Sequence, residues 1–230
     1  MLKKIVFLLY VCFVQTAFAN VCIEYKQAPN VTVKNPEPQK HIVLSDDPMD
    51  EYHGKYFSFK LHGITQANLI LKYQIECDFI RESDGFCIRI KNLDTTIGYE
   101  NIDIKIDKSH KKNSCSYNAV LKHEEKHVDA YLSVLRDLSG EIENAVYNAA
   151  NSIMPEYASN YTEIDDIIEG FNNKIKNHPD LKLIIQKIQA AEEIRNKRID
   201  QEETGEDLKK CSWFAFYNFN FCVIIYLVKE

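Results

Sequence analysis

Two histidines and a glutamate in the middle of the chain have the spacing of a metal-binding catalytic motif. His123 and His127 are four residues apart, and Glu124 directly follows the first histidine. Side chains at positions i and i+4 of a helix share one face, so both imidazoles can bind one zinc ion. The adjacent carboxylate can then reach a water molecule on that metal. The HExxH pattern therefore predicts a zinc site at His123 and His127, with Glu124 as the catalytic residue.

The residues around this motif predict a helix with one apolar face. At about 100° per residue, Glu124 falls inside this face, His127 on its flank and His123 at its edge. The face itself comprises Tyr117, Val120, Leu121, Val128, Tyr131, Val134, Leu135 and Leu138, and the charged side comprises Lys122, Glu125, Lys126, Asp129 and Arg136. A carboxylate on an apolar face is costly unless it is paired or lies beside a metal. Its position therefore favours a functional role.

The motif leaves the third protein ligand open. The longer pattern HExxHxxGxxH needs a histidine at position 133, where this chain has Ser133, and is excluded. A glutamate from a following helix is an alternative, but one continuous helix would place Glu141 about 21 Å from His127. Either the helix turns back near Gly140 or the ligand comes from elsewhere. The candidates are Glu141, Glu143, Glu156, Asp165, Asp166 and His110.

A zinc ion with two histidines and a third protein ligand supports amide-bond hydrolysis. The fourth position holds water, whose pKa the metal lowers to about 7. Glu124 is expected to act as general base, taking the proton of this water during attack on a carbonyl and passing it to the leaving amine. Tyr131, one turn beyond His127, is a candidate for stabilising the tetrahedral intermediate, although core packing is the favoured interpretation.

Composition and charge describe a globular protein and exclude one large class of partners. The 230 residues can form one domain, or a domain with an appendage. A hydrophobic content of 45% and a charged content of 27% are ordinary for globular proteins. The net charge of −6 leaves no basic surface to neutralise phosphates, so no nucleic-acid partner is expected.

Residues 1–19 have the features of a signal peptide. Lys3 and Lys4 precede an apolar stretch at 5–14, and Ala17-Phe18-Ala19 provides the small residues of a cleavage site. The apolar stretch is short for a membrane span, which disfavours an anchor. We expect cleavage near Ala19 and export to the periplasm or the outside of the cell.

Export makes disulfides the expected state of the cysteines. Loss of Cys12 with the signal peptide leaves Cys22, Cys77, Cys87, Cys115, Cys211 and Cys222. An even number in an oxidising compartment favours disulfides over metal binding, and the spacings contain no CxxC pair. The sequence does not determine the pairing. A Cys77–Cys87 bridge needs a bulge because the two residues fall on opposite strand faces, and a bridge from Cys115 to the sheet is the alternative.

Alternating apolar residues predict a small antiparallel sheet ahead of the motif helix. The period of two covers the stretches 57–61, 69–79, 86–90 and 102–106, with a further strand expected near 42–44. Turn signals at Gly63, Ser83-Asp84-Gly85 and Gly98 separate them. One face of this sheet is expected to cover a core.

Helices are predicted to follow the sheet. The motif helix is expected to begin at Ser114 or Ser116 and to reach about Asn151 if Gly140 is tolerated. Two further helices are expected, one after Thr162 and one from Asp180, while residues 192–210 are charged enough to be solvated. The predicted fold class is α+β, with a small antiparallel sheet packed against a long HExxH helix and further helices C-terminal.

The predicted domain organisation has four parts. Residues 1–19 form the signal peptide, 20–158 an α+β metal-binding domain, 159–210 a helical appendage and 211–230 a hydrophobic tail. The tail is open to three interpretations: a strand that joins the core, a membrane-associating segment, or sequence without a role. The last is favoured, because a stretch of sixteen residues that includes two asparagines is marginal as a membrane span.

Residues 69–138 resemble a family of bacterial secreted zinc-dependent proteases. In that family a small cysteine-bearing β region precedes a helix with the pattern C-x-Y-x-A-V-L-x-H-E-x-x-H-V, which here runs from Cys115 to Val128. The resemblance covers about a third of the chain. It implies zinc at His123 and His127, catalysis by Glu124 and an exported enzyme.

Two functions follow from these residues. The first is a zinc metallopeptidase that acts on a peptide or cell-envelope protein substrate. The second is a non-catalytic secreted module, held together by disulfides, in which the histidines bind a structural metal or none. Membrane association through the tail is a variant of either function.

Overall fold

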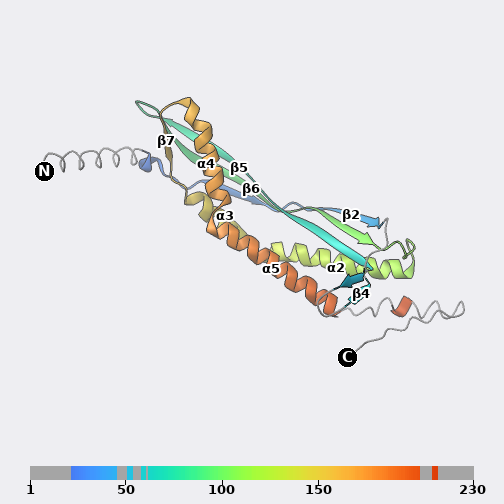
Figure 1. Cartoon of the computed structure of the whole chain (residues 1–230). Coiled ribbons are helices and arrows are strands. Elements are labelled where there is room, and N and C mark those ends of the chain that lie inside the picture. Colours follow the sequence, from blue (N-terminus) through green and yellow to red (C-terminus); the bar gives the residue numbers. More distant parts are fainter. Residues whose placement is uncertain (1–21, 46–50, 54–57, 61, 203–208, 212–230) are drawn as a thin grey trace, which may run out of the picture. The chain divides into compact units, whose positions relative to one another are not determined.

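The computed structural model describes residues 22–45, 51–53, 58–60, 62–202 and 209–211 (Figure 1). The predicted signal peptide and its cleavage site, Cys222 and the greater part of the hydrophobic tail lie outside the described residues.

Two long strands form a hairpin. β5 (Gly63–Arg81) and β6 (Phe86–Ile106) pair with each other and are joined by residues 82–85. The backbone N–H of Glu82 donates to the carbonyl of Gly85 at 2.9 Å, at the turn that the sequence predicts. A connection of this length requires antiparallel neighbours, because parallel strands need a much longer crossover.

β6 is one strand where the sequence predicts two. Gly98, expected to form a turn, lies inside the strand, where a Cβ atom would be 2.8 Å from Asn35 Oδ1 and 3.2 Å from Pro36 Cδ. The buried residues change parity twice along the strand, from Ile88 and Ile90 to Leu93, Thr95, Ile97 and Tyr99, and then to Ile102, Ile104 and Ile106. A strict period of two therefore breaks within a continuous strand. Glycine at position 98 allows a neighbouring segment of chain to approach closely.

The prediction of an antiparallel sheet is wrong for the strands of the N-terminal segment. β1 (Asn30–Lys34) pairs with residues 92–96 of β6, and β2 (Gln39–Leu44) pairs with residues 101–106, both in parallel. Only residues 35–38 connect β1 and β2, so both strands run the same way along β6. Alternation of apolar residues reports which face is buried and not which way a strand runs, so the sequence pattern had no information on direction.

Three short strands complete the described β-structure. β7 (Glu156–Ala158) pairs antiparallel with residues 86–88 of β6. β3 (Glu51–His53) and β4 (Ser58–Lys60) form a separate antiparallel pair, within the region where a strand was expected at 57–61.

The predicted helices are present, and the fold class α+β is confirmed. α2 (Cys115–Asp137) carries the motif, and Ser114 caps it because its Oγ accepts a hydrogen bond from the backbone N–H of Tyr117 at 3.2 Å. The motif helix ends earlier than expected: Leu138, with ψ 4°, interrupts it before α3 (Ser139–Asn151) begins. The remaining helices are α4 (Ile164–Lys176), α5 (Pro179–Glu202) and the short 3₁₀ helices η1 (Ile23–Tyr25) and η2 (Tyr161–Glu163).

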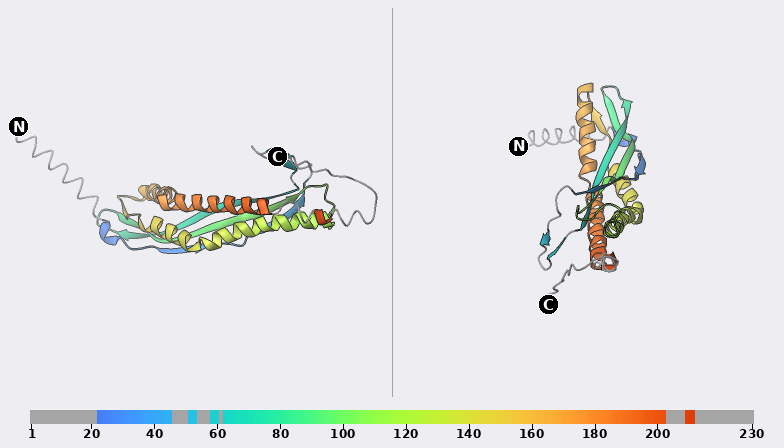
Figure 2. Two further views of the ribbon diagram at one scale, coloured as in Figure 1. Left: turned by 90° about the horizontal axis from the view of Figure 1, so that it is seen from below. Right: turned by 90° about the vertical axis from the view of Figure 1, so that its right-hand side faces the viewer.

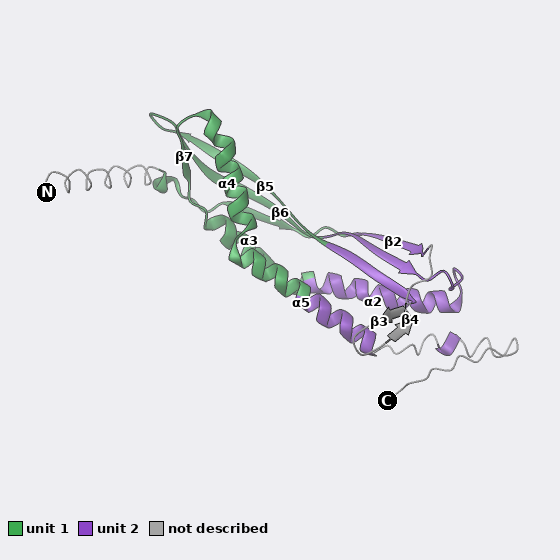
Figure 3. Cartoon of the chain, in the orientation of Figure 1, with its two compact units in different colours: residues 1–37, 69–98, 135–189 green, residues 38–68, 99–134, 190–230 purple. Residues whose placement is uncertain are grey.

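The chain divides into two compact units (Figure 3). Unit 1 comprises residues 1–37, 69–98 and 135–189, and unit 2 comprises residues 38–68, 99–134 and 190–230. Four elements are divided between the two units: β5, β6, α2 and α5. The boundaries of these units do not coincide with those of the four predicted parts, and the predicted domain organisation stays a prediction.

Each unit has its own buried residues. In unit 1 they come mainly from β6, α3, α4 and α5 and include Ile88, Ile90, Leu93, Val146, Phe171, Ile175 and Ile188. In unit 2 they come mainly from β6 and α2 and include Tyr99, Ile102, Ile104, Ile106, Val120, Val128 and Val134. The apolar face predicted for the motif helix is thus the buried face of α2.

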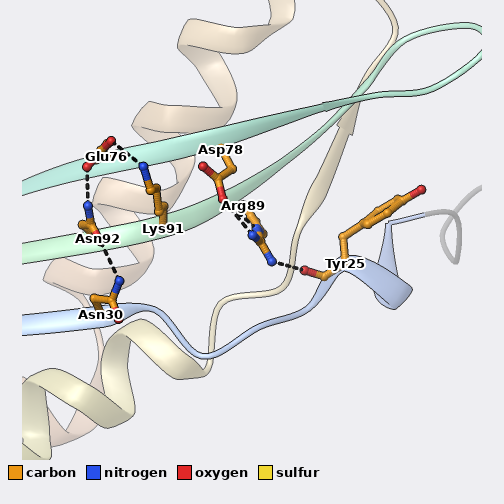
Figure 4. Close-up of polar contacts among 7 residues, drawn as sticks. All are labelled: Tyr25, Asn30, Glu76, Asp78, Arg89, Lys91 and Asn92. Atoms are coloured by element: carbon orange, nitrogen blue, oxygen red, sulfur yellow. Dashed lines mark hydrogen bonds and ion pairs between the residues drawn. The ribbon is translucent and has the colours of Figure 1, made fainter.

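Polar contacts tie the strands of unit 1 together on its surface (Figure 4). Glu76 on β5 accepts hydrogen bonds from Lys91, at 3.1 Å, and from Asn92, both on β6. Arg89 pairs with Asp78 at 2.7 Å across the same two strands. These groups are at least partly exposed, so each pair contributes little to stability.

Among the described cysteines, one disulfide lies in each unit. Cys22 is bonded to Cys87 in unit 1, and Cys115 to Cys211 in unit 2. The prediction of disulfides is confirmed, but both pairings considered from the sequence are wrong. Cys77 is a free thiol, consistent with its position on the opposite strand face from Cys87, and Cys115 bonds to the C-terminal segment rather than to the sheet.

The described helices include none that is both long and apolar enough to cross a membrane. Together with the two disulfides, this finding is compatible with an exported protein.

Candidate metal centre

The residues of the candidate site lie on two helices of unit 2. His123 and His127 are one turn apart on α2, and Asp200 is in the last turn of α5. This part of α5 lies beside α2 (Figure 2), where the side chain of Asn196 contacts that of His127. Within the described residues, His123, His127 and Asp200 are the one group of histidine, cysteine and acidic side chains that can offer three ligands to a metal.

The three ligand atoms form a nearly equilateral triangle. His127 Nε2 lies 3.2 Å from His123 Nε2 and 3.2 Å from Asp200 Oδ1, and His123 Nε2 lies 3.5 Å from the same oxygen. Tetrahedral ligands at zinc distances of about 2.0–2.2 Å are separated by about 3.3–3.5 Å from one another. The observed separations therefore fit three corners of a zinc tetrahedron.

The three candidate ligands differ in their exposure to solvent. The side chain of Asp200 is 56% exposed, whereas those of His123 and His127 are 26% and 11% exposed. The group is thus most exposed at the carboxylate.

Glu124 is buried next to this group. Its side chain extends toward β5, where Thr65 Oγ1 donates a hydrogen bond to Glu124 Oε2 at 2.8 Å and also contacts its backbone carbonyl at 3.1 Å. Burial raises the pKa of Glu124, while the hydrogen bond from Thr65 and the charges of His127 and His123 oppose that rise. Thr65 thus fixes the orientation of a carboxylate whose charged form burial disfavours.

Gly63 provides the space that Glu124 occupies. A Cβ atom at position 63 would lie 2.5 Å from Glu124 Oε1 and 2.7 Å from Val120 Cγ1. A side chain at this position of β5 is therefore incompatible with the observed position of the carboxylate. The sequence analysis interpreted Gly63 only as a turn signal.

Charges within the group favour an ionised aspartate. Burial acts to raise the pKa of Asp200, but hydrogen bonds and positive charge from His123 and His127 hold it well below its usual range. Burial acts to lower the pKa of His127, but hydrogen bonds with Asp200 and Asn196 and the charge of Glu124 raise it overall. The carboxylate is thus ready to bind a cation without first losing a proton.

α5 contacts the rest of unit 2 through polar side chains at helical spacing. Glu192 accepts a hydrogen bond from Tyr99, and Arg195 donates one to Ser133. Asn196 and Asp200 continue this face one and two turns further along. The C-terminal half of α5, expected from its charge to be solvated, therefore has one face that holds the third candidate ligand in place.

The exposure of the three HExxH residues agrees with their expected places on the apolar face of the helix. Glu124 is 4% exposed, His127 is 9% exposed and His123 is partly exposed, which reproduces the expected order from the middle of the face to its edge. Tyr131 is partly buried, and its ring packs edge-on against that of Tyr99 at 5.4 Å.

The acidic residues considered as third ligands are not part of the group. Glu141, Glu143, Glu156, Asp165 and Asp166 all belong to unit 1. Within that unit, Glu141 pairs with Lys187, and Glu156 pairs with Lys174. His110 belongs to unit 2, where its ring Nε2 lies 3.0 Å from Nδ1 of His62.

Asp200 was missed by the sequence analysis, although a signal for it was present. The buried residues of α5, Leu181, Ile184 and Ile188, recur every three or four positions. The same spacing continued along the helix reaches Glu192, Asn196 and Asp200. Polar residues on the continuation of a buried face are candidates for a site.

The disulfide of unit 2 encloses the whole group. Cys115 is the first residue of α2, and its partner Cys211 follows the end of α5. All three candidate ligands thus lie within the loop that this disulfide closes.

Comparisons with known proteins identify no relative. No family model matches the chain, and neither a curated protein nor a solved structure matches it. The function is therefore argued from the geometry of the site.

Proposed function

We propose that the protein is a zinc-dependent metallopeptidase that uses His123, His127 and Asp200 as metal ligands and Glu124 as general base. The observation that carries the proposal is the triangle of three ligand atoms, 3.2–3.5 Å apart. A buried carboxylate follows directly on one of these ligands in the chain. Surface clusters of acidic residues lack this combination of nitrogen donors and a shielded base.

The donor set favours zinc over harder cations. Two imidazole nitrogens and one carboxylate oxygen are ordinary ligands of zinc, whereas magnesium and calcium prefer oxygen alone. Three protein ligands, of which Asp200 is the most exposed, would leave the fourth position for water, as in the catalytic class of zinc site.

Glu124 and Thr65 have separate roles in the proposed hydrolysis. When bound, zinc would polarise the substrate carbonyl and acidify the attacking water. Glu124 takes the proton from this water and transfers it to the leaving amine. Thr65 holds one oxygen of that carboxylate, so the general base meets the water in a fixed orientation.

Replacement of Glu124 tests catalysis separately from metal binding. In Glu124→Gln the hydrogen bond from Thr65 can be kept while the base is lost. We expect hydrolysis of a casein-type substrate to fall by about 10²–10⁴-fold. The zinc content, measured by elemental analysis of chains purified without chelators, should stay at one ion per chain.

Glu125→Gln is the matched control. Glu125 is the next residue on α2 and is exposed, so its replacement removes the same charge away from the site. This variant should keep both hydrolysis and zinc. Equal activity in Glu124→Gln and the wild type would contradict the proposal, as would a wild-type chain purified without metal.

The second candidate function is a non-catalytic module with a structural metal. The Cys115–Cys211 disulfide favours it, because a covalent loop around all three ligands is also a way to stabilise a secreted domain. A fourth ligand from the protein, detected by X-ray absorption of the zinc-loaded chain, would support this function. A water molecule in that position supports the peptidase.

Export and family membership are part of the same proposal. The signal-peptide features of residues 1–19 and the resemblance of residues 69–138 to bacterial secreted zinc-dependent proteases both support an enzyme that acts outside the cytoplasm. Its substrate would be a peptide or a protein of the cell envelope. Release of the mature chain, beginning near Asn20, into the periplasm or medium would test this part.

A further inference from the structure

Asn196 contacts the ring of one candidate ligand. Its Oδ1 lies 2.9 Å from Nδ1 of His127. It is also hydrogen-bonded to Tyr131, one turn beyond His127 on α2.

The contact with His127 has one possible direction. Oδ1 is the amide atom that faces the ring. An amide oxygen only accepts hydrogen bonds, so Nδ1–H of His127 donates to Asn196.

The other ring nitrogen faces the remaining candidate ligands. His127 Nε2 lies 3.2 Å from both His123 Nε2 and Asp200 Oδ1. The contact with Asn196 at Nδ1 therefore holds the ring in the orientation in which Nε2 can bind a metal.

We propose that Asn196 is a positioning residue of the metal site, which holds the ring of His127 with Nε2 directed at the metal position. The geometry of α5 supports this role, because Asn196 and Asp200 are four residues apart on the same face. One helix thus supplies a ligand and the residue that orients another ligand. Arg195, which donates to Ser133 on α2, holds the same turn in place.

The inference rests on the proposed metal site and not on the proposed hydrolysis. Its test therefore measures zinc affinity rather than peptidase activity. Groups that hydrogen-bond to the remote nitrogen of a histidine ligand typically contribute about 10–100-fold to metal affinity.

Two substitutions separate positioning from packing. Asn196→Leu keeps the volume and removes the acceptor, and we expect zinc affinity to fall by about 10–100-fold. Asn196→Asp keeps an acceptor for Nδ1 and should restore affinity. Asn173→Leu, at an exposed position of α4 in unit 1, makes the same change away from the site and should have no effect.

The measurement is competition of the full chain with a chromophoric zinc chelator. The wild type and Asn196→Asp should bind zinc with similar affinity, and Asn196→Leu more weakly. Unchanged affinity in Asn196→Leu would overturn the inference. An equal loss in Asn196→Leu and Asn196→Asp would also overturn it, since it would indicate a packing role.

These outcomes are distinct from failure of the proposed function. A wild-type chain that binds no zinc contradicts both proposals, whereas unchanged zinc affinity in Asn196→Leu contradicts the positioning role alone. Conversely, zinc binding that depends on Asn196 without any peptidase activity supports the positioning role in the non-catalytic module.

Discussion

The two units of the chain differ in the burial of their ionisable side chains. Among the described residues, the buried acidic and histidine side chains all belong to unit 2 and are Asp107, His110, Glu124 and His127. In the described part of unit 1 the buried side chains are apolar apart from Thr95, and Asp78, Glu141 and Glu156 pair with lysine or arginine at partly exposed positions. Unit 1 therefore has an ordinary core with solvated charges.

This difference is a difference in the cost of burial. Removing an ionisable group from water costs free energy, which partners only partly return. Exposed ion pairs such as Lys187–Glu141 carry no such cost. Unit 2 bears this cost, and three of its elements, β5, α2 and α5, contribute contacts to Glu124 and His127. The proposed metal site would account for the burial of these two groups.

Removing the disulfides one at a time should produce the largest effect and the sharpest contrast between the units. The double variants Cys22→Ser with Cys87→Ser, and Cys115→Ser with Cys211→Ser, should each lose about 2–5 kcal/mol of stability, because each opens a long loop in the unfolded chain. Only the second pair encloses the candidate ligands. We expect zinc affinity to fall by about tenfold or more in that variant alone, since Asp200 lies near the free end of α5.

Urea unfolding and chelator competition on both variants provide the measurements. Circular dichroism of each variant controls for loss of fold before zinc is added. Equal loss of zinc affinity in both variants would contradict the assignment of the metal site to unit 2.

Gly63→Ala should have a smaller effect on stability and a specific effect on activity. The added Cβ would lie 2.5 Å from Glu124 Oε1, so the carboxylate or the strand must move, at a cost of about 1–3 kcal/mol. Displacement of the general base by about 1 Å can reduce turnover by about 10²-fold. Zinc binding should change little, because the three ligands lie elsewhere on α2 and α5. Thermal unfolding, casein hydrolysis and zinc content of the same preparation test this prediction, and unaltered hydrolysis would count against Glu124 as the base.

The parts of the site that could be predicted from sequence are those that depend on local spacing. A helical period of 3.6 residues is sufficient to place Glu124 and His127 on the buried face of α2. The third ligand depends on the path of the chain between His127 and Asp200, which brings α5 back to α2, and no local pattern contains that path. The charged composition of residues 192–210 suggested solvent exposure because composition averages over a helix and hides its one polar contact face.

The same distinction applies to the sheet. The hairpin turn at Ser83-Asp84-Gly85 is local and was predicted. The parallel pairing of β1 and β2 with β6 depends on how a distant N-terminal segment aligns with the strand, which alternation does not encode. The same alignment brings Cys22 to Cys87, because Cys22 lies eight residues before the start of β1 and Cys87 lies on β6, with which β1 pairs. The disulfide pairing was therefore unpredictable for the same reason as the strand direction.

The same substitution at a glycine of unit 1 should have the opposite sign. Gly140 lies within α3, and a Cβ atom there would meet nothing within 4 Å. Replacing a helical glycine by alanine removes backbone freedom from the unfolded chain, so Gly140→Ala should stabilise the protein by about 0.5–1 kcal/mol. Zinc binding and hydrolysis should remain at wild-type values. Urea unfolding of Gly140→Ala alongside Gly63→Ala measures both signs, and destabilisation by Gly140→Ala would indicate that unit 1 has a close contact where the structure has open space.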